Sequence, residues 1–166
     1  WDNETAKKGQ KARVYNGKRK VLAVVRLIEE STTHKLMVAC KTQAEWMKNY
    51  QYKWQQNPTI AKSKTYGTCV TYVACVLQRM KILEAGQFIW HDGEGHVDGA
   101  NSKMKVSYMG GTLKSRKDKL KKGDIIIAGD RTSTAAGGNS HIFILTGSWD
   151  DNGNPYVWDN QSASRI

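Results

Sequence analysis

The chain has 166 residues and a mass of 18.7 kDa, which suits one domain with an adequate hydrophobic core. Hydrophobic residues make up 39% of it and aromatic residues 9%, which excludes a disordered class. Its longest apolar stretch, residues 21–28, is interrupted by Arg26 and is far shorter than the ~20 residues that span a bilayer, so no membrane span is expected.

The net charge of +11 is concentrated in the first part of the chain. Residues 1–64 carry 14 Lys and Arg against 5 Asp and Glu, whereas residues 65–166 carry 12 against 10. A basic front half is typical of proteins that bind nucleic acid, an anionic membrane or an acidic polymer such as a bacterial cell wall, and equally of a plain solvated surface. Because no helix-turn-helix, zinc-finger or aromatic RNA-binding pattern accompanies it, we expect no nucleic-acid partner.

The pattern of polar and apolar residues only partly defines the secondary structure of the N-terminal part of the chain. Residues 1–20 are polar and lysine-rich without an apolar period, and we interpret them as a basic linker or arm before a single domain at 21–166. Residues 21–28 suit either a buried helix or a strand. Thr42 and Glu45 have capping-box spacing, which predicts a helix that begins there. Such a helix would carry three aromatic core residues on one face: Trp46, Tyr50 and Trp54.

A second helix is predicted over residues 69–80, and Cys69 opens it. Near a helix N-terminus the unpaired N–H groups and the helix dipole favour the thiolate, which is the nucleophilic form. Val73, Val76 and Met80 follow Cys69 at helical offsets, so the edge that carries the thiol continues into the apolar face. We therefore expect the core to hold this helix in place.

The other two cysteines are interpreted as packing residues. Cys75 lies six residues along the same helix, about 240° around the axis from Cys69, and has no unpaired N–H groups beside it. Cys40 ends an apolar stretch and has no evident partner in the sequence. Three cysteines do not make a disulfide framework, and no Cys-x-x-Cys pair is present for zinc or redox chemistry.

Residues 90–98 hold His91, His96 and three carboxylates, a composition that could suggest a metal site. Zinc motifs on helices place their histidines one turn apart, and glycines interrupt this run. The spacing does not fit a calcium loop either. We therefore expect no metal and no other cofactor, and interpret the run as a substrate-binding loop or a plain turn.

Three β-rich segments follow in the C-terminal part: 124–129, 141–147 and 155–160. They predict an antiparallel sheet packed on the Cys69 helix, which is an α+β architecture. His141 opens the second segment, and Asp159 and Asn160 close the third. Because successive side chains on a strand point to opposite faces, only one of Asp159 and Asn160 can face His141. We favour Asp159.

These three positions have the residue types of a thiol hydrolase in its usual order. Cys69 is the candidate nucleophile, His141 the candidate general acid/base, and Asp159, with Asn160 as its rival, the group that orients the imidazole. The pattern also fits a transglutaminase-like or toxin-type thiol acyltransferase. A third possibility is a non-catalytic cell-wall binding module in which Cys69 and His141 are merely packed.

Four motifs within residues 60–166 carry a family resemblance: Tyr66-Gly-Thr-Cys69-Val-Thr-Tyr-Val, Leu120-x-x-Gly-Asp124-Ile-Ile, Ser140-His141-Ile-Phe-Ile-Leu and Tyr156-Val-Trp-Asp159-Asn160. In this order they resemble the papain-like peptidoglycan hydrolases, namely the NlpC-type endopeptidases and the cysteine, histidine-dependent amidohydrolases/peptidases. The resemblance implies a papain-like core and cleavage of amide bonds in cell-wall peptides. Thr68 precedes the nucleophile where these groups commonly have Asp or Gln, which leaves the oxyanion partner open.

The resemblance therefore predicts a cysteine endopeptidase or amidase that acts on bacterial peptidoglycan, as an endolysin or autolysin does. We expect the backbone N–H of Cys69 and one further donor, for which Tyr66 is the candidate, to stabilise the oxyanion. Anionic wall polymers would meet the basic N-terminal half. The expected location is the cell wall, reached by secretion or by release during phage lysis.

Overall fold

The computed structural model describes residues 12–49, 69–91, 96–129, 140–160 and 162. Within them the elements follow in this order: β1 (Arg13–Val14), β2 (Lys20–Leu27), η1 (Glu30–Thr32), α2 (Thr33–Asn49), α3 (Cys69–Arg79), β3 (Trp90–His91), β4 (Val97–Asp98), β5 (Met104–Tyr108), η4 (Lys114–Lys119), β6 (Ile125–Gly129), β7 (His141–Trp149) and β8 (Pro155–Trp158). The labels η1 and η4 denote short 3-10 helices.

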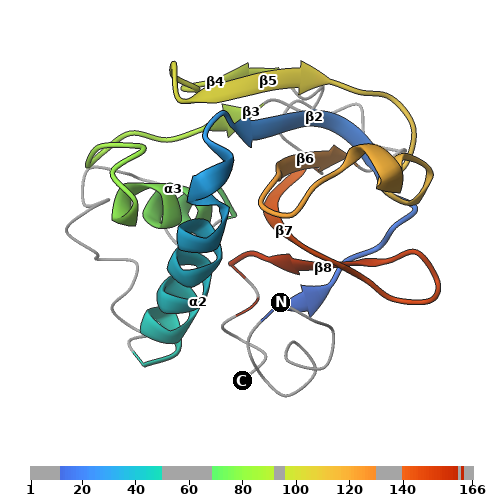
Figure 1. Cartoon of the computed structure of the whole chain (residues 1–166), viewed down its shortest axis with the longest axis horizontal. Coiled ribbons are helices and arrows are strands. Elements are labelled where there is room, and N and C mark those ends of the chain that lie inside the picture. Colours follow the sequence, from blue (N-terminus) through green and yellow to red (C-terminus); the bar gives the residue numbers. More distant parts are fainter. Residues whose placement is uncertain (1–11, 50–68, 92–95, 130–139, 161, 163–166) are drawn as a thin grey trace.

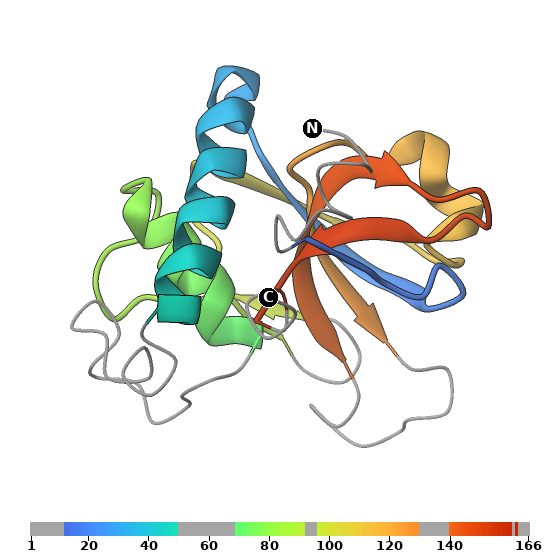
Figure 2. The same cartoon turned by 90° about the horizontal axis from the view of Figure 1, so that it is seen from below.

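Six of the strands form one antiparallel sheet in the order β1-β8-β7-β6-β2-β5, and β3 pairs with β4 in a separate two-stranded sheet. Helices α2 and α3 pack against each other and lie together on one side of the large sheet (Figure 1). The view from below shows the same separation of helices and strands (Figure 2). The predicted α+β class is therefore confirmed. None of the described helices is long and apolar enough to cross a membrane.

Buried side chains alternate between the two faces of the large sheet, as the two-residue period of a strand requires. The face toward α2 and α3 is filled by one set: Ala23, Val25, Ile125, Ile127, Ile142, Ile144, Tyr156 and Trp158. The opposite face is filled by their neighbours, with two residues that flank η4: Val21, Val24, Ile126, Ala128, Phe143, Leu145, Val157, Leu113 and Leu120. Both faces are thus buried, which explains why β6 and β7 read as nearly continuous apolar runs.

The three predicted C-terminal strands are confirmed as β6, β7 and β8. The ambiguous segment at 21–28 forms strand β2, which lies between β5 and β6. The interpretation of residues 12–20 as part of a linker is wrong, because Arg13 and Val14 form the edge strand β1 beside β8 and Ala12 is buried in the core. A strand of two residues is too short to show an apolar period, so the sequence pattern missed it.

Helix α2 begins at Thr33 and not at Thr42, so the predicted capping box lies inside the helix. Burial of one helical face explains the earlier start: the residues buried along the helix include Leu36, Met37, Cys40 and Ala44. Trp46 packs against the core as expected. Tyr50 and Trp54 lie outside the described residues.

Helix α3 confirms the predicted helix over 69–80 to within one residue. Val73 and Val76 are completely buried, and Met80 packs against the same cluster. The chain leaves the helix at Lys81, which has a positive φ of 61°, and the N–H of Ile82 donates to the carbonyl of Leu77. The apolar face thereby fixes the position of the helix N-terminus, where Cys69 lies.

Candidate active site

The three predicted catalytic residues lie on three separate elements of the fold. Cys69 is the first residue of α3, His141 is the first residue of β7, and Asp159 directly follows β8. The packing of α3 against β7 and the pairing of β7 with β8 therefore bring together residues that are far apart in the sequence.

Asp159, and not Asn160, is the acidic or amide group that faces His141. Its Oδ2 lies 2.7 Å from Nε2 of His141. The carboxylate is completely buried, and the hydroxyl of Ser162 accepts a hydrogen bond of 2.9 Å from the Asp159 backbone N–H. Since Nε2 is occupied by Asp159, Nδ1 is the ring nitrogen that remains for the Cys69 thiol. The fixed orientation of the ring is what a base needs when it must serve one nucleophile.

Arg13 of β1 is a fourth member of the site, and the sequence analysis missed it. Its Nε lies 3.0 Å and 2.8 Å from the two carboxylate oxygens of Asp159, and its Nη2 forms an ion pair with Oδ2. Nη2 also lies 3.5 Å from Nε2 of His141. Asp159 therefore meets two positively charged groups, and Arg13 offsets the cost of burying its charge.

The pKa values of the acid and the base follow from these contacts. Burial would raise the pKa of Asp159, but hydrogen bonds from His141 and Arg13, and their charges, lower it below its ordinary value. Burial would lower the pKa of His141, yet its hydrogen bonds to Asp159 and Cys69 and the charges of both raise it to about 9. Asp159 is thus ionised and His141 is an imidazolium at neutral pH.

Cys69 is half-buried and has the chemistry of an activated thiol. Burial would raise its pKa, but side-chain hydrogen bonds from His141 and His91, the charge of His141 and a backbone hydrogen bond from Ile142 lower it to about 6. Because this value lies below that of His141, the resting pair is a thiolate and an imidazolium between about pH 6 and about pH 9. The helix N-terminus adds to the stabilisation of the negative charge.

The other two thiols have opposite environments, as predicted. Cys40 is completely buried in α2, and burial raises its pKa well above the ordinary range. Cys75 is 1% exposed in α3, and burial raises its pKa to about 12. Cys40 and Cys75 are therefore buried packing residues. Of the three cysteines, Cys69 is the one that is partly exposed to solvent and has a lowered pKa.

Residues 90–98 supply a second histidine to the site. Trp90 and His91 form β3, which pairs with β4, so the described part of this run is a short hairpin. The Oγ of Ser140 lies 2.8 Å from Nδ1 of His91, and Ser140 directly precedes His141. His96 also belongs to the described residues and is exposed. Within the described part of the chain, no group of three or more His, Cys, Asp or Glu side chains could hold a metal ion.

Tyr15 lines the other side of His141. The two ring centroids are 5.5 Å apart, and the ring of Phe143 lies 4.5 Å from that of Tyr15. The Arg13 guanidinium stands 5.5 Å from the Tyr15 ring centre. The rings of Tyr15 and Phe143 thus both pack against the imidazole of His141. Tyr15, like Arg13, lies in the segment that composition alone assigned to a linker.

Two parts of the predicted site have different outcomes. Of the two rival residues at the end of β8, Asp159 is the one that hydrogen bonds to His141. Tyr66, the expected oxyanion donor, lies outside the described residues. Its role stays a prediction, as does that of the Cys69 backbone N–H.

Comparison with known proteins adds no family to this description, because no family model, no curated protein and no solved structure matches the chain.

Proposed function

We propose that this chain is a papain-like cysteine hydrolase that cleaves an amide bond in the stem peptides of bacterial peptidoglycan. The observation that carries the proposal is the arrangement of a half-buried thiol of lowered pKa beside an imidazole that is held by a buried carboxylate. Such an arrangement converts a weak nucleophile into a thiolate with a proton donor next to it. A packed, non-catalytic cysteine has no need of it.

The reaction follows from the roles of the three side chains. The Cys69 sulfur attacks the carbonyl carbon, a C–S bond forms, and the π electron pair moves to the oxygen. When the tetrahedral intermediate collapses, the C–N bond breaks and the proton on Nδ1 of His141 passes to the leaving amine. His141 then takes a proton from water, which attacks the thioester and releases the acid and the Cys69 thiolate. Asp159 remains ionised and holds the ring throughout.

The choice of fold family and substrate rests on the order of the motifs. A cysteine at the start of a helix, a histidine at the start of a strand and an acid after the next strand are arranged along this chain as in the papain-like peptidoglycan hydrolases. The helix that carries Cys69 packs on an antiparallel sheet, as a papain-like core requires. The proposed setting is the cell wall, reached by secretion or phage lysis.

Anionic wall polymers are the proposed partners of a basic surface beside η4. The surface combines the β1–β2 turn with η4 and the residues after it: Lys18, Arg19, Lys20, Lys114, Arg116, Lys117, Lys119, Lys121 and Lys122. Two backbone hydrogen bonds join the turn to the start of η4, from Leu113 to Arg19 and from Lys114 to Gly17, at 2.9 Å and 2.8 Å.

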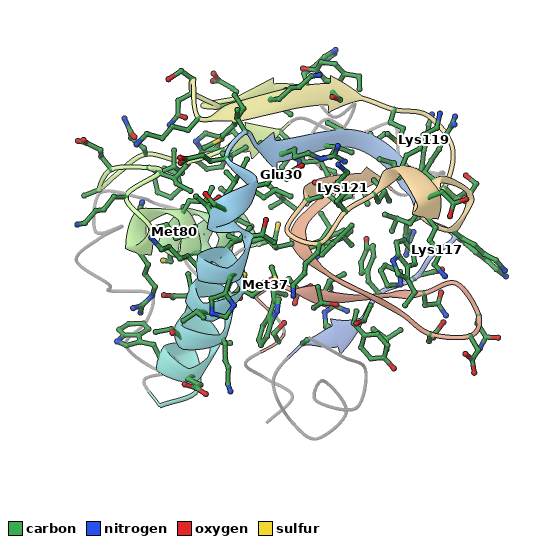
Figure 3. The ribbon with its side chains drawn as sticks, in the orientation of Figure 1. Glu30, Met37, Met80, Lys117, Lys119 and Lys121 are labelled. Carbon is green, nitrogen blue, oxygen red and sulfur yellow. The ribbon has the colours of Figure 1, made fainter. Side chains whose placement is uncertain are left out.

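Figure 3 labels Lys117, Lys119 and Lys121 on and just after η4. Lys121 lies 3.8 Å from the carboxylate of Glu30, and this ion pair is exposed and weak. Most of the side chains of the basic surface are exposed, so their charge can act on a polyanion at low ionic strength. The residues of this surface come from both halves of the chain. The expected site for wall polymers was the N-terminal half alone, because most of the net positive charge lies there.

The direct test is digestion of purified cell walls by the wild type and by Cys69→Ala, followed by mass analysis of the soluble fragments. The proposal predicts muropeptides with new amino and carboxyl termini from the wild type alone. Addition of a primary amine separates a hydrolase from an acyltransferase, because the acyltransferase would attach the amine to the new carbonyl end. Equal digestion by Cys69→Ala, or none by the wild type on several wall types, would refute the proposal.

A further inference from the structure

The edge strand β1 directs two side chains to the candidate site. Arg13 pairs with Val157 of β8. The N–H of Tyr15 then donates to the carbonyl of Pro155 at 2.8 Å. Residues two apart on a strand share a face, so Arg13 and Tyr15 lie on the same side, and the intervening Val14 is 43% exposed. The backbone of β1 thus fixes where the guanidinium of Arg13 stands.

One oxygen of the Asp159 carboxylate serves both His141 and Arg13. Oδ2 lies 2.7 Å from Nε2 of His141 and 2.8 Å from Nε of Arg13, and it forms the ion pair with Nη2. Oδ1 lies 3.0 Å from Nε of Arg13, and the Ser162 hydroxyl donates to it at 3.4 Å. Because the two cationic side chains share the negative charge of Oδ2, Arg13 weakens the hold of Asp159 on the His141 N–H.

Arg13 also acts on His141 directly through its charge. Its Nη2 lies 3.5 Å from Nε2 of His141. A guanidinium has donors and no acceptor, so beside a protonated imidazole this is a contact between two positive charges and not a hydrogen bond. The side chain of Arg13 is 12% exposed and that of Asp159 is completely buried, so water screens the repulsion little. Both effects of Arg13 make the imidazolium less stable.

We infer that Arg13 is a positioning residue that acts through Asp159: it shares Oδ2 with the imidazolium, so that His141 can release its proton to the leaving group. Without Arg13, Asp159 would hold the imidazolium more tightly. As the C–N bond of the substrate breaks, its electron pair goes to nitrogen, which takes the proton from Nδ1, and the imidazole becomes neutral. An imidazolium that is held too tightly gives this proton more slowly. The proton transfer rests on the proposed amide hydrolysis, whereas the effect on the resting His141 needs no substrate.

The other groups that contact His141 do not obscure its titration. Cys69 of α3 has a pKa of about 6, far below the pKa of about 9 of His141. The ring of Tyr15 lies 5.5 Å from that of His141, and burial raises the pKa of its hydroxyl above the ordinary value of about 10. Phe143 of β7, which also packs on the imidazole, does not titrate. A change near pH 9 therefore reports on His141.

Three substitutions of Arg13 separate its charge from its contacts. Arg13→Met removes both, and Arg13→Gln removes the charge but keeps a neutral N–H donor for the buried carboxylate. Arg13→Lys keeps the charge near Oδ2 without the two-pronged contact. Lys18→Met, in the exposed turn after β1, is the matched control.

Two readouts apply to each variant. The first is the NMR titration of the His141 ring in the resting protein, with its signal assigned by comparison with His141→Ala. The second is the rate of wall-peptide release at pH 7 and at pH 10. The first needs no substrate, and a purely structural role of Arg13 would not raise the His141 midpoint.

We expect the His141 midpoint at about 9 in the wild type and in Lys18→Met, and above it in Arg13→Met and Arg13→Gln. Wild-type release should fall about tenfold between pH 7 and pH 10 as the imidazolium is lost, and release by Arg13→Met by less than about threefold. At pH 7, Arg13→Met should be about three- to tenfold slower than the wild type. Arg13→Lys should keep the wild-type midpoint, because the charge remains. If Arg13→Met fails to fold, Arg13→Gln carries the test.

The outcomes separate this inference from the proposed function. A raised His141 midpoint in the neutral Arg13 variants, without wall digestion by the wild type, would support the action of Arg13 on His141 and refute peptidoglycan as the substrate. Wall digestion by the wild type, with an unchanged or lowered midpoint in the folded neutral variants, would overturn the inference and leave the proposed function intact. A raised midpoint with an unchanged rate at pH 7 would refute the effect on proton release.

Discussion

The guanidinium of Arg13 holds the carboxylate of Asp159 across 146 positions of sequence, with Nε at 3.0 Å and 2.8 Å from its two oxygens. The contact joins β1, at the edge of the large sheet, to the residue that directly follows β8. The side chain of Asp159 is completely buried and that of Arg13 is 12% exposed, so water screens this pair little. The N-terminal segment of the fold is therefore part of the candidate active site.

Replacing Arg13 with methionine should destabilise the fold and impair the reaction. The change leaves a buried carboxylate with one cationic partner in place of two, which costs about 3–5 kcal/mol in the free energy of unfolding. Urea denaturation measures this loss. Arg13→Lys should recover only part of it, because an ammonium does not provide the two-pronged contact of a guanidinium.

Lys18→Met is the control for the Arg13 variants, since it removes a positive charge from the exposed turn after β1. Its stability should equal that of the wild type to within about 0.5 kcal/mol. Equal stability of Arg13→Met and Lys18→Met would show that Arg13 does not stabilise the buried Asp159.

Asp159 and Asn160 should differ sharply in their effect on the rate. Asp159→Asn keeps the shape of the side chain but removes the charge that orients the His141 imidazolium, so the rate of wall-peptide release should fall by about 10²- to 10⁴-fold. Asn160→Ala should change the rate by less than about tenfold, because the structure directs Asp159 and not Asn160 to His141. The opposite order of the two effects would assign the orienting role to Asn160.

The rate should depend on pH as a bell with limbs near the two cited pKa values. Activity requires the thiolate, so it rises as the pH increases through about 6, and it requires the imidazolium, so it falls as the pH increases through about 9. The measurement is kcat/KM for peptide release between pH 4.5 and pH 10, a range that extends beyond both limbs. A rate that still climbs above pH 9 would show that a neutral imidazole, and not the ion pair, is the reactive form.

The basic surface should affect wall binding and not the chemical step. Charge reversal by the pair Lys114→Glu and Lys117→Glu, both exposed on η4, should weaken sedimentation with purified walls in dilute buffer. The difference from the wild type should shrink as salt approaches 1 M, where the screening length is about 3 Å. The exposed pair Glu29→Lys and Glu84→Lys, remote from η4 in sequence, gives the matched control with added positive charge.

Cys69 alkylation checks that the η4 variants retain an intact site. Its rate at pH 7 should be the same in the wild type and in both double variants, because iodoacetamide is uncharged. Unchanged wall binding by the Lys114 and Lys117 variant at low salt would refute the basic surface as the attachment site.

The parts of this structure that the sequence predicts are those with a clear local period. Helix α3 repeats its apolar residues at helical spacing after Cys69, and β6 and β7 are apolar runs of strand length bounded by turn residues. The order of Cys69, His141 and Asp159 was also readable, because each opens or closes such an element. The approach of these three side chains in space depends on strand pairing and helix packing. The sequence predicts that approach only through the expected α+β class.

The parts that the sequence misses depend on contacts distant in the chain. Arg13 stands in a lysine-rich stretch, and only the pairing of β1 with β8 distinguishes it from its basic neighbours. His91 lies in a glycine-broken run that suggested a substrate-binding loop or a plain turn, and its hydrogen bond with Ser140 spans 49 positions of sequence. Thr42 and Glu45 match a capping box, yet the packing of Leu36 and Met37 extends the helix past that local signal.

Alkylation of the wild type by iodoacetamide at pH 7, with each of the three cysteines quantified by mass spectrometry, measures whether Cys69 is an activated nucleophile. We expect rapid modification of Cys69 alone, because its pKa of about 6 makes it mostly thiolate, while burial keeps Cys40 and Cys75 protonated. The same reaction should slow in His141→Ala. A Cys69 that reacts no faster than Cys40 and Cys75, or that reacts equally fast without His141, would contradict an activated nucleophile at this site.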